Sequence, residues 1–152
     1  MEPELIGIKQ DRPGFDGFIG SWLCPFDRTM VVDVGPSRSL PQLIDSLTAR
    51  GVRRVDYVLL THIHMDHAGG LAGFLDHFPT ARAVCHGKAI PHLLDPSKLW
   101  LGSQKTLGDL AETYGPIKPV KRGRLIPHTE AQAEGIDLIE TPGHAVHHLS
   151  FI

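Results

Sequence analysis

Residues 61–70 read Thr61-His62-Ile63-His64-Met65-Asp66-His67-Ala68-Gly69-Gly70, and this stretch decides how the rest of the sequence is interpreted. Four potential metal ligands lie within six residues of it: His62, His64, Asp66 and His67. The apolar run 55–60 before it indicates a buried strand, and the apolar spacing within 69–78 predicts a helix that ends at Pro79. Open α/β sheets place binding sites at the carboxyl ends of their strands in this way.

The spacing of the four ligands suggests how they divide between two metal ions. Residues two apart in an extended loop face the same way, so His62 and His64 are predicted to bind one metal ion. Asp66 and His67 come at the helix entrance and are predicted to bind a second ion. The alternative is a polar loop whose histidines are only solvated or bonded to backbone. Three histidines and one aspartate this close together favour the metal.

The segment His62-Ile63-His64-Met65-Asp66-His67 resembles the H-x-H-x-D-H signature of the metallo-β-lactamase-fold superfamily at every specified position. The resemblance extends to Val31-Val32-Asp33-Val34-Gly35 and to Thr141-Pro142-Gly143-His144. It implies an α/β fold, the αβ/βα sandwich, of which residues 1–152 supply mainly the N-terminal half. It also implies that Asp33 supports the metal loop by hydrogen bonds. This superfamily contains hydrolases, nucleases and oxidoreductases, so the function has to be argued separately.

A further ligand and several pocket residues come from the later part of the chain. The alternating segment 135–141 predicts a strand that ends just before His144. A third His joining His62 and His64 gives the three-ligand arrangement of catalytic zinc, so His144 is assigned to their ion. His148 is a candidate for the pocket. In the resembling family the segment between the second and third motifs often shapes the substrate pocket, which adds three candidates: Trp100, for which core packing is the alternative, Ser103 and Lys105.

The remaining elements alternate along the chain. Further strands are predicted at 5–9, 15–23, 29–34, 81–86, 124–127 and 148–152, with helices at 39–51 and, broken at Pro96, over 91–114. This order predicts layered α/β structure. His86 ends one of these strands, and we interpret it as a structural residue, the usual role of a lone His.

The resembling family's second half supplies a bridging Asp and a final His, and neither has a counterpart in this sequence. The sequence ends at Ile152 within an apolar strand run. We therefore expect a C-terminally incomplete domain over 1–152. Its uncovered apolar face and unpaired strand edge are expected to favour a homodimer or another homo-oligomer.

Composition narrows the class of protein. The 152 residues suit one domain, and 41% hydrophobic with 21% charged residues is ordinary for a globular protein. No apolar run approaches the roughly 20 residues of a membrane span, and a net charge of −2 without a long basic run argues against nucleic-acid binding. The N-terminus shows no secretory pattern, so we expect a cytoplasmic protein. Cys24 and Cys85 are expected to be buried thiols.

These features together predict a metal-dependent hydrolase with two zinc ions. It would cleave an ester, thioester or lactone in a small-molecule substrate through a metal-activated water, with Asp66 as a catalytic residue as well as a ligand. Iron or manganese would also suit imidazole and carboxylate ligands, so an iron-dependent oxidoreductase or a nuclease of the same fold stays open. The second hypothesis is a non-catalytic or metal-deficient module. Asp66 and His67 alone are too few for a four-coordinate zinc.

Overall fold

The computed structural model describes residues 2–132 and 135–152. They form a six-stranded sheet in the order β1-β2-β3-β4-β5-β6 and a separate hairpin of β7 and β8. The six strands of the sheet are β1 (Glu4–Ile8), β2 (Ile19–Pro25), β3 (Thr29–Val32), β4 (Tyr57–Leu59), β5 (Arg82–Cys85) and β6 (Leu125–Pro127). The pairs β1–β2 and β2–β3 are antiparallel, whereas β3 to β6 run parallel.

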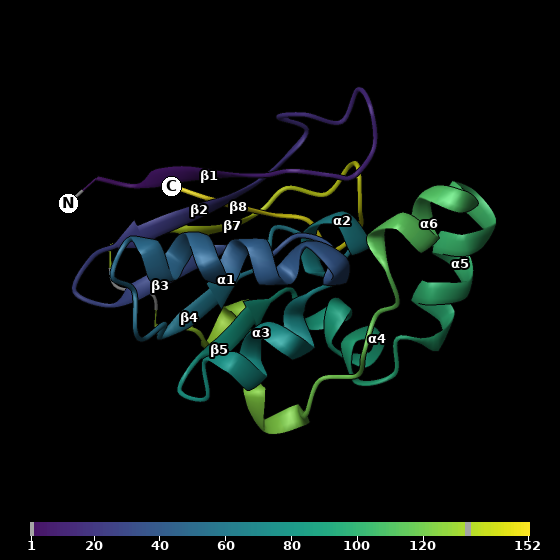
Figure 1. The fold of residues 1–152 in the computed structure, drawn as a ribbon. Coiled ribbons are helices and arrows are strands. Elements are labelled where there is room, and N and C mark those ends of the chain that lie inside the picture. Colours follow the sequence, from purple (N-terminus) through teal and green to yellow (C-terminus); the bar gives the residue numbers. More distant parts are fainter. Residues whose placement is uncertain (1, 133–134) are drawn as a thin grey trace.

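Helices cover one face of this sheet, with α1 (Leu40–Ala49) and α3 (Leu71–His77) in front of it in Figure 1. Alternate strand residues such as Val31 and Val58 point to that face and are fully buried against Leu43 and Phe74. The remaining helices are α2 (Met65–Ala68), α4 (Ile90–Leu94), α5 (Ser97–Leu107) and α6 (Asp109–Tyr114). The predicted α/β fold is confirmed.

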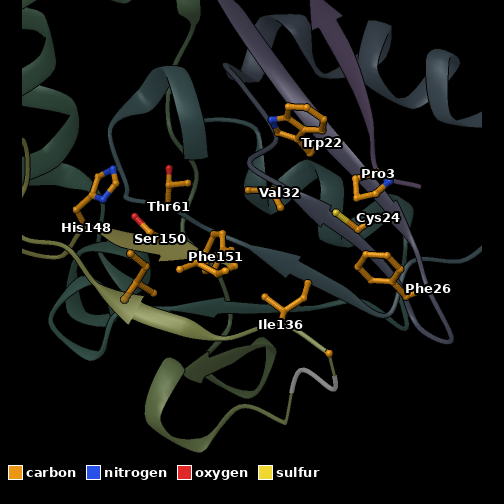
Figure 2. Close-up of a pocket in the computed structure, with 13 residues that line it drawn as sticks. Pro3, Trp22, Cys24, Phe26, Val32, Thr61, Ile136, His148, Ser150 and Phe151 are labelled. Atoms are coloured by element: carbon orange, nitrogen blue, oxygen red, sulfur yellow. The ribbon is translucent and has the colours of Figure 1, made fainter. Parts of the chain in front are cut away.

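The opposite face of the sheet carries a smaller core. Met30, Leu59 and Val84 lie there, and the antiparallel hairpin of β7 (Leu138–Glu140) and β8 (Leu149–Phe151) packs against them. A largely apolar groove of about 440 Å³ separates the hairpin from β2 and β3. Figure 2 shows it, with side chains of the sheet such as Trp22 on one side and those of the hairpin such as Phe151 on the other.

Several predicted elements differ from the structure; the strand predicted at 135–141, for example, is shortened to β7. The strand predicted at 15–23 begins four residues later, because Gly17 has φ 68°, a left-handed conformation that a strand does not contain. The helix predicted over 91–114 is broken at Pro96, as expected, and again at Gly108, whose φ is 53°. Residues 61–70, the loop with the predicted metal ligands, also contain the short helix α2, which the sequence pattern did not separate from α3.

Two other expectations can be compared with the described residues. Cys24 and Cys85 are both buried and free, so the prediction of buried thiols is confirmed. Within residues 2–132 and 135–152, every helix is too short or too polar to cross a membrane.

Candidate metal centre

The parallel strands bring polar side chains to one edge of the sheet. Asp33 follows the end of β3, Thr61 and His62 follow β4, and His86 follows β5. Since β3, β4 and β5 are parallel neighbours, their carboxyl ends lie side by side. The metal-loop sequence therefore folds at the position where α/β sheets place their sites.

Asp33 organises this edge. It is buried, and its backbone has φ 55°, an uncommon value for a residue with a side chain. Its Oδ1 accepts a hydrogen bond from the backbone N–H of Thr61 (2.8 Å), and its Oδ2 accepts from Thr61 Oγ1 (2.6 Å) and faces His67 Nδ1 at 2.7 Å. Ser21 Oγ donates to the Asp33 carbonyl at 2.7 Å. One carboxylate thus ties the end of β4 to α2.

His62 presents a free ring nitrogen to the interior of the site. Because the Thr61 hydroxyl donates to Asp33, its oxygen accepts from His62 Nδ1 at 3.0 Å, which leaves the lone pair on Nε2. That Nε2 is buried and has no hydrogen-bond partner among the described residues. Burial, reinforced by the nearby His67 and His64, lowers the pKa of His62 to about 2, so the ring is neutral. A buried, unpaired imidazole lone pair fits a metal ligand.

Three histidines converge here. His64 Nδ1 lies 3.0 Å from His144 Nε2, and one ring nitrogen from each of His62, His64 and His144 lies within 4.8 Å of the others. Tetrahedral zinc with bonds of about 2.0–2.1 Å holds its ligand atoms about 3.3 Å apart, so the spacing suits one ion. Burial, followed by the charge of His144, lowers the pKa of His64, which favours its neutral form. The structure brings these three predicted ligands together.

Asp66 and His67 lie beside this group, with Asp66 Oδ2 3.4 Å from His67 Nε2. Burial alone would lower the pKa of His67, but the hydrogen bond to Asp33 and the charges of Asp33 and Asp66 outweigh it and raise the pKa. Among the described residues, Asp66 and His67 do not form a group with a third His, Cys, Asp or Glu in which all the ligand atoms lie within 4.8 Å of one another. A second ion would therefore have two protein ligands in this part of the chain.

A second groove, of about 490 Å³, adjoins two of the three histidines. His64, Asp66 and His144 are among the residues that line it. One face of α5 forms a wall of this groove. The residues on that face are three or four positions apart along the helix: Lys98, Leu99, Gly102, Ser103, Thr106 and Leu107. The groove is more apolar than polar, which suits a substrate with an apolar group.

The predicted pocket residues divide between different places. Ser103 lines the α5 groove, as expected. Trp100 packs against the core and Lys105 is exposed outside the groove, so the structure does not support substrate contact by either. His148 lies with its ring 5.2 Å from that of His62 and lines the groove beneath the hairpin, where Figure 2 shows it near Thr61.

Thr61 and the α5 face were not predicted from the sequence to belong to the site. Thr61 could have been noticed as the residue between the predicted strand and the first His. The α5 wall could have been found from the helical spacing of Leu99, Gly102 and Thr106, but the sequence does not show which face of a helix meets the metal loop. That depends on how α5 packs.

Comparison with known proteins identifies the family to which the chain is similar. The family model described as the metallo-beta-lactamase superfamily matches residues 22–152. The metallo-beta-lactamase fold-containing protein ST1585 of Sulfurisphaera tokodaii is 30% identical over 138 residues, which are 86% of this chain and 51% of that protein. The hydroxyacylglutathione hydrolase of Photorhabdus laumondii is 29% identical over 153 residues, covering 97% of this chain and 46% of that enzyme.

Solved structures show the same fold. The crystal structure of the archaeal metallo-beta-lactamase superfamily protein ST1585 from Sulfolobus tokodaii superposes with a TM-score of 0.73 at 26% identity, over 97% of this chain and 59% of that one. MEM-A1, a subclass B3 metallo-beta-lactamase from a soil metagenome library, gives 0.68 at 21% identity, over 99% and 56%. The chain spans about half the length of the two relatives named above.

Proposed function

The chain belongs to the metallo-beta-lactamase superfamily, and from that premise we propose that the whole protein is a metal-dependent hydrolase of an ester, thioester or lactone. The observation that carries the proposal is the convergence of one ring nitrogen from each of His62, His64 and His144 within 4.8 Å, together with the buried Nε2 of His62, which has no hydrogen-bond partner among the described residues. Relatives that include a hydroxyacylglutathione hydrolase support hydrolysis of an acyl bond.

In this proposal the residues of the chain have separate tasks. His62, His64 and His144 hold one divalent ion, zinc in our proposal, and Asp66 with His67 contributes to a second. Such ions supply a Lewis acid for a carbonyl oxygen and lower the pKa of water. Asp33 and Thr61 fix the direction of the ligand rings through the hydrogen bonds described above.

Asp66 is the proposed catalytic residue. Its side chain is 28% exposed and lines the α5 groove together with His64 and His144, so in this proposal it faces both the metal ligands and the substrate. There its carboxylate orients the attacking water and accepts a proton from it. The water oxygen bonds to the carbonyl carbon, the bond from that carbon to the leaving oxygen or sulfur breaks, and the leaving group takes up the proton.

The α5 groove is the proposed binding site for the apolar part of a small-molecule substrate. A Cβ atom added at Gly102 would meet no atom within 4 Å, so the groove is open at this position. We expect Gly102→Leu to fill it and to lower kcat/KM for long-chain acyl substrates by about 10-fold or more, which corresponds to the loss of one to two buried methylene groups. Gly102→Ala is the matched control and should change little.

Activity against a panel of carbonyl esters, thioesters, lactones and phosphodiesters tests the proposal. The protein should hydrolyse at least one carbonyl substrate, lose this activity when a chelator removes the metal, and regain it with zinc. His64→Ala should be inactive, while His77→Ala, which changes an exposed histidine on α3, should be normal. Turnover of phosphodiesters alone, or oxygen consumption with iron, would contradict it.

A further inference from the structure

A second group of metal-type side chains lies at the same edge of the sheet. His86 follows β5, His128 follows β6, and Glu140 ends β7 of the hairpin. Glu140 Oε1 lies 3.3 Å from His86 Nε2 and 3.0 Å from His128 Nε2, and the two imidazole rings stack with centroids 4.9 Å apart. Residue types and spacing alone would suit a metal ion here as well.

The hydrogen bonding of His86 argues against a metal. The backbone N–H of Lys88 donates to His86 Nδ1 at 3.0 Å, where His86 caps a 3₁₀ turn at Gly87–Ala89. A backbone amide can only donate, so Nδ1 carries the lone pair and the proton of the neutral ring is on Nε2. That N–H points at Glu140. A metal bound through Nε2 would need a lone pair at that atom, and would force a proton onto Nδ1, opposite the Lys88 amide.

The surroundings of the His128 ring also argue against a metal ion in this group. Its Nδ1 is buried and has no hydrogen-bond partner in the described part of the chain. A metal-bound histidine almost always donates its other ring N–H to an acceptor, and Nδ1 of His128 meets no acceptor among the described residues. A proton on Nε2, donated to Glu140, avoids burying an unpaired N–H. Glu140 therefore accepts an N–H bond from each histidine.

This arrangement fastens the hairpin to the main sheet. The backbone pairing of β7 and β8 is to each other, and Leu149 of β8 donates its N–H to Thr61 O at 2.7 Å. Glu140 lies opposite Leu149 in the hairpin register, so its carboxylate anchors the other strand at the same level. The chain continues from Glu140 through Thr141, whose N–H donates to His148 O, to the ligand His144. Glu140 and the Thr141–His148 hydrogen bond thus precede the turn that brings His144 to His64.

We infer that Glu140 is a positioning residue, which holds His144 in the metal centre by accepting N–H bonds from His86 and His128. The inference deepens the proposed function, because it takes His144 as a metal ligand. It assigns no metal to the second group. A carboxylate that is half exposed suits this task, since its remaining lone pairs stay accessible to water.

The test measures metal binding in the purified protein by chelator competition and by the absorption spectrum after Co²⁺ substitution. We expect Glu140→Ala to weaken Co²⁺ binding about 10-fold and to alter the spectrum, as loss of a partner that orients a ligand does. Glu140→Gln keeps a carbonyl oxygen that can accept both bonds, and should restore most of the affinity. Glu130→Ala, on the exposed turn after β6, is the matched control.

Two results would overturn the inference. One is loss of a full equivalent of metal in His86→Ala or His128→Ala, which would make the group a metal site. The other is an unchanged Co²⁺ affinity and spectrum in Glu140→Ala. If the wild-type protein bound no metal, the proposed function would fail. Amide hydrogen exchange of residues 138–144 would still test whether Glu140 attaches the hairpin to the sheet. Glu140→Ala should make this exchange faster, and Glu140→Gln should not.

Discussion

Two clusters of histidines lie at one edge of the sheet. The first contains His62, His64, His67 and His144, and the second contains His86 and His128. They differ in the partner of Nδ1, which is an acceptor oxygen at His62 and His67 but a backbone N–H donor at His86. In the first cluster, the Nδ1 atoms of His62 and His67 face acceptor oxygens of Thr61 and Asp33, and on the neutral ring of His62 this leaves the lone pair on Nε2. In the second cluster, His86 Nδ1 faces an amide donor, which places the proton on Nε2. The comparison teaches that the partner of the nitrogen facing away from the metal decides whether the other nitrogen has a lone pair for the metal.

The difference starts in the backbone at the ends of β3 and β5, the two strands that flank β4. After β3 the chain adopts a positive φ at Asp33, and the Asp33 carboxylate reaches both Thr61 and His67. After β5 the chain instead enters a 3₁₀ turn, whose free N–H groups need an acceptor and take the His86 ring. The same residue type at equivalent strand ends therefore receives a different tautomer.

The largest expected effect comes from removing a ligand of the first cluster. His62→Ala should weaken zinc binding by more than about 100-fold, because partners that merely orient ligands are already worth 10–100-fold. Chelator competition measures the affinity, and His77→Ala is the control because His77 lies in neither cluster. If His62→Ala kept wild-type affinity while His86→Ala lost it, the comparison would be reversed.

Removing the charge of Asp33 should have the next largest effect. Asp33→Asn keeps the shape of the side chain, but its amide N–H₂ would face donors of Thr61 or His67 that now bond to a carboxylate oxygen. We expect zinc affinity to fall about 10–100-fold. Each buried donor left unpaired should also lower the free energy of unfolding by about 1–3 kcal/mol.

Zinc titration and urea denaturation of the same Asp33→Asn sample measure both effects. Asp76→Asn, on the exposed surface of α3, is the matched control. An Asp33→Asn protein with wild-type stability and zinc affinity would show that the hydrogen bonds of Asp33 do not distinguish the two clusters.

The sequence predicted the parts of this arrangement that depend on local patterns. The buried strand before His62 and the helix after it follow from apolar spacing over a few residues, and both are present as β4 and α3. The second break, at Gly108, was missed, because a glycine inside a helical pattern does not reveal whether it will adopt a positive φ.

The second cluster could not be predicted, because its members lie far apart in the sequence. His86, His128 and Glu140 meet only through the pairing of β5 with β6 and the packing of the hairpin on the sheet. Each appeared in the sequence as an isolated polar residue. Tautomers are also invisible there, since they depend on neighbouring donors and acceptors such as the Lys88 amide.

The smallest expected effect concerns the Thr61 hydroxyl. Thr61→Val is nearly isosteric and keeps the backbone N–H bond to Asp33, but it removes the oxygen that accepts from His62 Nδ1. His62 would then resemble His128, whose Nδ1 has no partner in the described part of the chain. One neutral hydrogen bond is worth about 0.5–1.5 kcal/mol, so we expect zinc affinity to fall about 2–10-fold. Thr61→Ser retains the hydroxyl and should bind as tightly as the wild-type protein. Equal affinities for the valine and serine variants would mean that the acceptor beside His62 does not tune the ligand, and the contrast with His86 and His128 would have to rest on Asp33 alone.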